Sequence, residues 1–189
     1  MLFPDMPRPL HVFEPRYREM LLEALVSDRI IGMVMLKPGH EDDYFGTPPV
    51  FAVGCAGVIS QIEELPDGRY NIVLTGLTKF RIKAEKTTRT FRLAEVEAIP
   101  DTLEDEDRDL LRAYRPRLLE LFSRVSSDVA PSPEEMPDPE LVNGLAQFLR
   151  LDPLARQGLL ERVGPLERAR GLLELAGQGK SAAARPREP

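Results

Sequence analysis

The chain has 189 residues, 42% of them hydrophobic, which is enough for one large domain or two small ones. Thirty-one acidic residues against 25 basic ones give a net charge of −6, which does not favour a polyanionic partner. The single cysteine, Cys55, excludes an internal disulfide and fits a reducing compartment. The sequence shows no secretory signal, and its apolar runs are too short to cross a bilayer, so we expect a cytoplasmic protein with no membrane partner.

Residues 1–100 predict an antiparallel β domain with one helix. The stretch PLHVFEPRYREML (9–21) begins extended and becomes helical after Pro15, so a helix is expected near 15–27 with Glu14 assisting its cap. Turn residues PDGR (66–69) separate two long alternating segments. Strands are expected at 30–36 (fully buried), 50–65, 70–76, 79–86 and 91–99. Irregularities are expected beside Gly54 and Gly57 and between Leu93 and Ala94.

Residues 101–178 predict a helical domain, and 179–189 a disordered tail. An acidic stretch after Pro100 suits a helix N-terminus, and Pro116 should kink or split the helix that follows. Three further helices each begin with a proline. Asp138 and Asp152 precede two of these prolines and are expected to cap their helices. The predicted fold class is therefore α+β.

The residue patterns of catalytic and metal sites are not found. His11 and His40 are the only histidines, and Cys55 lies among apolar residues, where an inert buried thiol is expected. The acidic loop HEDD (40–43) lacks the ligand spacing of a known metal site. GQGKS (177–181) resembles a phosphate loop, but Glu174 stands where that motif needs glycine. We therefore predict no catalytic residues, no metal and no cofactor.

Two surfaces are candidates for binding a macromolecule. The segment 79–92 is basic and includes Phe80 and Phe91, which would suit a nucleic acid; the alternative is a solvated outer face of the sheet. Its candidate nucleic-acid-binding residues are Lys79, Arg81, Lys83, Arg89 and Arg92. Tyr44 and Phe45, in the loop 40–49, would suit a polypeptide partner; the alternative is that they fold back over the sheet.

Two stretches resemble the amino-terminal, substrate-binding domain of the ATP-dependent Lon proteases. The first is LFPDMPRPLHVFEPRYREML together with the glycine-bearing strand and the PDGRYNIVLTGLTKFRI hairpin. The second is LVNGLAQFLRLDPLARQGLLERVGPLERARGLLEL. The resemblance extends to about Ala176 and implies a PUA-like antiparallel pseudo-barrel, a helical bundle and a role in recognising polypeptides. The ATPase and peptidase modules of Lon are not in this sequence, so the resemblance implies a stand-alone, non-enzymatic member.

The resemblance also bears on individual residues. In the family, the elbow carries a strand into the helix that packs on the barrel, so Glu14, Arg16 and Tyr17 are expected to hold this junction, with Arg16 and Glu14 as ion-pair or capping partners. Their alternative role is to line a peptide groove. The family's elbow follows an apolar first strand, whereas only Met1 precedes Leu2 here. We therefore expect an unpaired sheet edge, with residues such as Ile30, Val34 or Ile72 uncovered beneath it.

The leading hypothesis is a module that binds unfolded or extended polypeptides, as an adaptor or weak holdase. A sheet edge or the cleft between the two domains would serve. Its partners would be such polypeptides, a separate Lon-type ATPase protease, and a second copy of the chain through the exposed edge. The alternative is an RNA-binding PUA-like module that uses the segment 79–92, although the net charge makes nucleic acid the less favoured partner.

Overall fold

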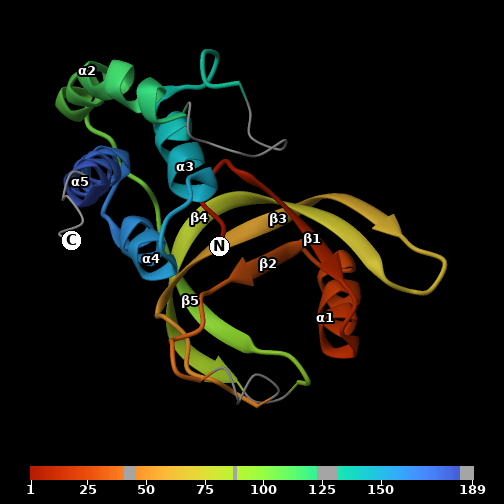
Figure 1. The fold of residues 1–189 in the computed structure, drawn as a ribbon. Coiled ribbons are helices and arrows are strands. Elements are labelled where there is room, and N and C mark those ends of the chain that lie inside the picture. Colours follow the sequence, from red (N-terminus) through yellow and green to blue (C-terminus); the bar gives the residue numbers. More distant parts are fainter. Residues whose placement is uncertain (41–45, 87–88, 123–131, 184–189) are drawn as a thin grey trace, which may run out of the picture. The chain divides into compact units, whose positions relative to one another are not determined.

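The computed structural model describes residues 1–40, 46–86, 89–122 and 132–183, with side chains as far as Gly177. The chain divides into two compact units, Met1–Pro100 (unit 1) and Asp101–Pro189 (unit 2). Unit 1 holds the strands and one helix, and unit 2 holds the remaining helices (Figure 1). The predicted α+β class is confirmed.

Unit 1 is built on a five-stranded antiparallel sheet in the order β1-β4-β3-β2, with β5 also paired to β4. Leu65 N–H donates to the Arg69 carbonyl at 2.8 Å and closes the predicted turn between β3 and β4. Helix α1 follows β1 directly, as the proline at its first turn predicts. The elements are β1 (Pro7–Val12), α1 (Pro15–Leu25), β2 (Ile30–Met33), β3 (Val53–Glu64), β4 (Tyr70–Lys86) and β5 (Leu93–Ile99).

Strand β4 is one strand of 17 residues, where the sequence indicated two separate strands. One of its edges pairs with β3 from Tyr70 to Arg81. Its other edge pairs first with β1, over Tyr70–Thr75, and then with β5, over Lys79–Lys86. Strand β4 therefore joins all the neighbouring strands into one strongly curved sheet (Figure 1).

Two details of the predicted strands are corrected. Strand β2 ends at Met33, and Ile30 is 41% exposed, because β2 is the outer strand of the sheet and is not buried on both faces. The irregularity expected between Leu93 and Ala94 is instead in β4, between Ile82 and Ala84, which pair with Val96 and Glu95. The irregularity expected beside Gly57 is confirmed as a register shift between Ala56 and Gly57.

The first residues of the chain contribute to the core of unit 1. Leu2, Phe3 and Met6 are fully buried. Leu2 and Phe3 lie against Gly57 and Gly76, which pair with each other across β3 and β4. A Cβ added to Gly57 would lie 2.6 Å from Leu2 Cδ2, and a Cβ added to Gly76 would lie 2.0 Å from the Phe3 carbonyl oxygen. The prediction that Ile72 lies uncovered beneath a free sheet edge is therefore wrong, because Ile72 is 3% exposed and pairs with Leu10 of β1.

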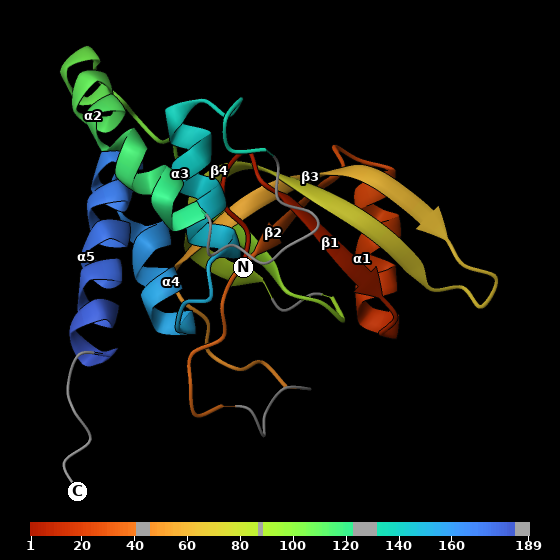
Figure 2. The same cartoon turned by 45° about the horizontal axis from the view of Figure 1, so that its top comes forward.

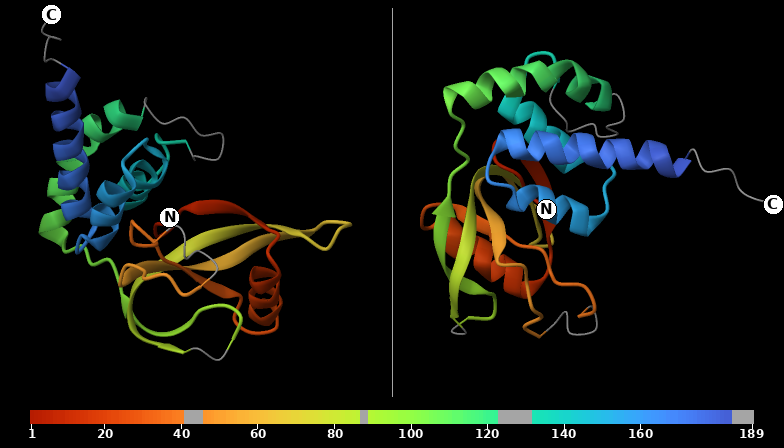
Figure 3. Two further views of the ribbon diagram at one scale, coloured as in Figure 1. Left: turned by 60° about the horizontal axis from the view of Figure 1, so that its bottom comes forward. Right: turned by 90° about the vertical axis from the view of Figure 1, so that its left-hand side faces the viewer.

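Unit 2 consists of α2 (Asp105–Phe122), α3 (Asp138–Phe148), α4 (Pro153–Glu161) and α5 (Pro165–Ala183). Helix α2 continues through Pro116 and is not split. Helix α5 packs against α2 and α3 (Figures 2 and 3). It extends to Ala183, beyond the predicted end of the helical region at 178.

The two predicted aspartate caps differ in outcome. The Asp152 carboxylate accepts hydrogen bonds from Leu154 N–H at 2.9 Å and Ala155 N–H at 3.3 Å, which confirms it as a cap. Asp138 does not cap α3; its carboxylate instead accepts a hydrogen bond from Arg115 at 2.6 Å. A guanidinium from α2 thus takes the carboxylate that the sequence assigned to the helix end.

Arg168 is the central polar residue of unit 2, and its side chain is completely buried. Its guanidinium donates to both carboxylate oxygens of Asp101, at 2.9 and 3.2 Å. It also donates to Asn143 Oδ1 at 2.5 Å and to the Leu159 carbonyl at 3.1 Å. These bonds join α3, α4 and α5 to the first residue of the unit, and they satisfy a charge that would otherwise be costly to bury.

We expect Arg168→Met to lower the free energy of unfolding of unit 2 by about 3 kcal/mol, because it removes one partner of a buried ion pair. Urea denaturation followed by far-ultraviolet circular dichroism measures this. Arg108→Met is the control, since the Arg108–Asp105 pair is exposed and should contribute less than about 1 kcal/mol. Equal destabilisation by the two substitutions would contradict the central role of Arg168.

We expect Gly76→Ala to destabilise unit 1 by about 3 kcal/mol, since the new Cβ would collide with the Phe3 backbone and push the buried first residues out of the core. Thermal unfolding measures this. Gly158→Ala in α4 is the matched control: nothing lies within 4 Å of its added Cβ, so the substitution should stabilise the helix by up to about 1 kcal/mol. An unchanged melting temperature for Gly76→Ala would contradict the contact with Phe3.

Candidate polypeptide-binding groove

Unit 1 contains a cavity of about 890 Å³ between α1 and the concave side of the sheet, which we call the groove. Its walls come from the end of β1, from α1, from β2, from the second half of β4, and from β5 with the residues that precede it. The segment 46–50 closes one end. The left view of Figure 3 shows the curved sheet with α1 beside it. This volume lies in the upper part of the range for ligand pockets.

The groove is lined mainly by apolar side chains. Phe80 and Phe91 are 5% and 7% exposed and form deeply buried parts of its wall. Gly32 and Gly54 leave room for the Phe80 ring, because a Cβ on either would lie within 3.1 Å of it. Val96 of β5 also lines the groove and is 48% exposed. Further apolar lining comes from Tyr17, Met20, Ile31, Met33, Ile82 and Leu93.

Hydrogen bonds connect α1 to the chain segment just before β5. Arg89 pairs with Glu23 at 3.4 Å, and the Thr90 hydroxyl donates to Glu19 at 2.5 Å. Arg92 pairs with Glu85 and also donates to the Pro48 carbonyl at 2.7 Å. These contacts hold one wall of the groove against the other.

The charges along the groove balance. Its lining contains four acids, Glu14, Glu23, Asp28 and Glu85, and four bases, Arg16, Lys86, Arg89 and Arg92. Most of these charges are paired with one another, as the contacts above show for Arg89 and Arg92. A groove without excess charge does not attract a polyanion, and its apolar walls favour an uncharged, apolar occupant.

The structure brings three of the predicted polypeptide-binding residues together at the groove. Arg16 donates to Glu14 at 3.0 Å, and its guanidinium lies 4.7 Å from the centre of the Tyr17 ring. All three line the groove, so the residues at the elbow are also at the groove. Glu14 makes no side-chain cap, which corrects that expectation, because its carboxylate binds Arg16. Tyr44 and Phe45 lie outside the described residues.

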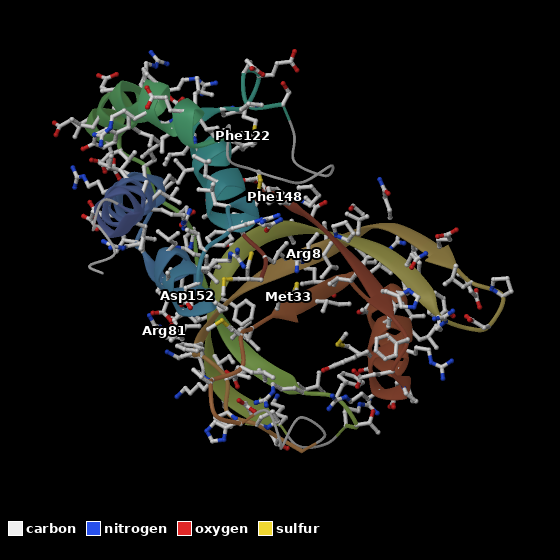
Figure 4. All side chains as sticks on the ribbon, in the orientation of Figure 1. Arg8, Met33, Arg81, Phe122, Phe148 and Asp152 are labelled. Atoms are coloured by element: carbon white, nitrogen blue, oxygen red, sulfur yellow. The ribbon has the colours of Figure 1, made fainter. Side chains whose placement is uncertain are left out.

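The predicted nucleic-acid-binding residues do not form one surface. Lys79 is 1% exposed, which corrects its assignment as a surface residue: both Lys79 and Phe80 are buried, so β4 is covered on both faces there. Lys83 pairs with Glu97 at 3.0 Å. Arg89 and Arg92 line the groove in ion pairs, whereas Arg81 lies away from it (Figure 4). Neighbouring acids therefore offset much of the basic segment.

Sequence reasoning missed β2 and β5 as walls of the groove. The alternation in 91–99 could have indicated Val96 as an exposed apolar residue, but no local pattern shows which wall it faces. Met33 of β2 borders the groove (Figure 4), although the sequence suggested that its strand was buried on both sides. Both assignments depend on how the sheet curves, which local sequence does not encode.

A second, smaller hollow of about 480 Å³ lies over β1, β3 and β4. It carries a polar network, in which His11 bonds to Asn71 at 2.8 Å and Asn71 donates to Glu63 at 2.8 Å. Arg69 contacts His11 at 3.2 Å and also bonds to Asp67, and this guanidinium lowers the pKa of the Asp67 carboxyl. These contacts hold the hairpin ends together beside a hollow that is smaller than the groove.

Two side chains that the sequence raised as candidates for chemistry, Cys55 and His11, are buried or already bonded in the described part of the chain. The Cys55 side chain is fully buried, and its thiol donates to the Ala56 carbonyl at 3.4 Å, while His11 is engaged by Asn71 and Arg69. In the described ranges, no three His, Cys, Asp or Glu side chains gather as a metal site needs. A search of the described helices for one long and apolar enough to span a bilayer also finds none.

Comparison with known proteins gives consistent matches. A family model described as the ATP-dependent protease La (LON) substrate-binding domain matches residues 1–177. The Lon protease of Trichlorobacter lovleyi is 34% identical over 180 residues, which cover 89% of this chain and 21% of that protein. The Lon protease of Geobacter metallireducens is 30% identical over 179 residues, with 89% and 21% covered. The chain thus spans about a fifth of the length of these relatives.

Solved structures agree with this match. The crystal structure of a Lon N-terminal domain protein from Xanthomonas campestris superposes with a TM-score of 0.63 at 25% identity, covering 92% of this chain and 91% of that one. The N-terminal domain of the Mycobacterium avium complex Lon protease gives the same TM-score at 21% identity over the same shares, and supports the fold. The chain belongs to the family of substrate-binding domains of the ATP-dependent protease La, Lon.

Proposed function

We propose that this chain binds extended, apolar polypeptide segments in the groove of unit 1 and catalyses no reaction. The observation that carries the proposal is a cavity of about 890 Å³, mainly apolar and balanced in charge, in a member of the Lon substrate-binding family. Unfolded proteins expose the apolar segments that folded proteins bury, so such a groove would prefer them to native proteins.

Glu14, Arg16 and Tyr17 have a specific role in this proposal. The Arg16–Glu14 pair is partly buried, with the two side chains 20% and 15% exposed, and it holds the guanidinium over the Tyr17 ring. This contact fixes one side of the groove mouth while the aromatic ring remains available for apolar contact. The residues that form the elbow would thus also orient the bound segment.

We further propose that the protein acts as an adaptor or weak holdase, with a separate Lon-type ATPase protease as a partner. The support is the family match, which is to a binding domain. A fluorescent, reduced and carboxymethylated α-lactalbumin tests the binding step by fluorescence anisotropy, with native α-lactalbumin as control. Binding of the unfolded form alone is expected; equal affinity for both forms, or for neither, would contradict the proposal.

We expect Val96→Glu to weaken binding of the unfolded α-lactalbumin by about tenfold, since it places an unpaired charge in the apolar groove. Val96 is already 48% exposed, so stability should change by no more than about 0.5 kcal/mol. Leu77→Glu is the matched control: Leu77 is 45% exposed, also lies in a strand of unit 1, and does not line the groove. Equal losses in the two variants would argue against binding in the groove.

For the RNA alternative, we expect only weak, salt-sensitive binding that involves few cations, because acidic residues pair with Lys83, Arg89 and Arg92. Filter binding to single-stranded RNA at several salt concentrations measures this. The double substitution of Arg81 and Lys83 by Gln should leave unfolded-protein binding unchanged. Tight RNA binding that this double variant abolishes would instead favour the RNA-binding function.

A further inference from the structure

Strand β2 has a free edge, which follows from its register with β3. In an antiparallel pair, residues alternate between those bonded to the partner strand and those whose N–H and C=O point away from it. Ile59 N–H donates to the Arg29 carbonyl at 2.9 Å, so Arg29 is one of the residues whose backbone bonds to β3. Continuing in register, Ile31 and Met33 bond to β3, and the backbone groups of Ile30 and Gly32 point to the other side.

The described part of the chain leaves this edge largely unoccupied. Ile30 N–H makes a long contact of 3.4 Å with the Asp28 carboxylate. No hydrogen bond among the described residues occupies the Gly32 N–H or its carbonyl, and Gly32 is exposed. The free edge thus presents the Gly32 N–H as a donor, with the carbonyl groups of Ile30 and Gly32 as acceptors on either side of it.

The free edge of β2 faces the groove. Five consecutive residues, 30–34, line the cavity, although successive side chains of a strand point to opposite faces. Residues next to one another in the strand can all line the cavity if the backbone edge of β2 itself borders it. Gly32 lies at the centre of this edge, and the Phe80 ring is 3.1 Å from where its Cβ would be; because Gly32 has no side chain, another backbone can approach closely there.

We propose that a bound polypeptide adds to β2 in the groove as an extra strand, hydrogen-bonded to Gly32 and Ile30. This inference rests on the proposed function and specifies how the segment is held. Alternating backbone donors and acceptors match an extended polypeptide backbone, and the balanced charge of the lining fits an uncharged segment. Alternate side chains of that segment would point toward the apolar wall around Phe80.

This mode of binding accounts for tolerance of sequence. Every non-proline residue carries the same N–H and C=O, so the hydrogen bonds with β2 would be independent of the client's side chains. The apolar wall would add a preference for segments with apolar residues at alternate positions. A segment rich in proline would be excluded, because proline has no N–H to donate to an edge strand.

The test compares two substitutions at one position. Gly32→Pro removes the edge N–H and places a ring at the edge, whereas Gly32→Ala keeps the N–H and adds a similar Cβ beside Phe80. Proline is tolerated on an edge strand where its nitrogen faces away from the ladder, as it does here. Both substitutions add a Cβ beside Phe80, but only proline removes the N–H, so we expect Gly32→Pro to bind the carboxymethylated α-lactalbumin at least about tenfold more weakly than Gly32→Ala does. Thermal unfolding shows whether both variants fold.

A second measurement needs only the wild-type protein. The probe is a fluorescent peptide of alternating threonine and valine, made in three forms: unmodified, N-methylated at every valine, and N-methylated at every threonine. In an extended peptide the two sets of N–H groups point to opposite edges. We expect at least one methylated form to lose about tenfold or more in affinity, because its hydrogen bonds to β2 are removed.

The outcomes separate the inference from the proposed function. If the wild type binds unfolded α-lactalbumin, but Gly32→Pro binds as well as Gly32→Ala and all three peptides bind alike, strand addition is overturned while the groove function stands. If the wild type binds no unfolded probe, both fail. If the protein forms a dimer that Gly32→Pro abolishes and no peptide competes with it, the occupant of the edge is a second copy of the chain, which overturns the assignment to a client.

Discussion

Strand β4 is hydrogen-bonded along its whole length of 17 residues, with partners on both edges as far as Arg81, and the groove depends on this pairing. One edge binds β3, and the other binds β1 and then β5. Between these two partners, Gly76 exchanges hydrogen bonds with the start of the chain, at 2.9 Å to Asp5 and 3.0 Å to Met6. Because paired strands twist progressively, so long a ladder cannot remain flat. The curvature brings β5 round to form a wall of the cavity that β2 also lines.

Glycines decide what can lie against this curved sheet. Where Gly57 faces Gly76, the absence of side chains admits Leu2 and Phe3, so the chain's first residues become core. Gly32 and Gly54 make room in the same way for Phe80, which then forms part of the groove. Close approach of other groups, not chain flexibility, explains these glycines. Pairs of glycines in the sheet thus make room for core residues at one place and for a wall of the groove at another.

Local chemistry in the sequence was enough to predict the fold class, the strand-to-helix elbow, the turn after β3 and the Asp152 cap. Each of these depends on residues close together in the chain. The burial of Lys79, the pairing of Asp138 with Arg115 and the bonds around Arg168 could not be predicted, because each depends on groups brought together from distant segments. The groove falls between these cases: the elbow residues were identifiable, but the walls formed by β2 and β5 exist only once the sheet has curved.

The free edge of β2 also sets how tightly a client could bind. A four-residue strand offers few hydrogen bonds, each worth about 1 kcal/mol net. Ordering an unfolded segment and restricting its motion costs at least about 4 kcal/mol, so the apolar walls must provide the surplus. Affinity in this mode of binding would therefore be modest, and release would be rapid. A deeper or more charged groove would hold particular sequences longer and would lose the generality that backbone pairing confers.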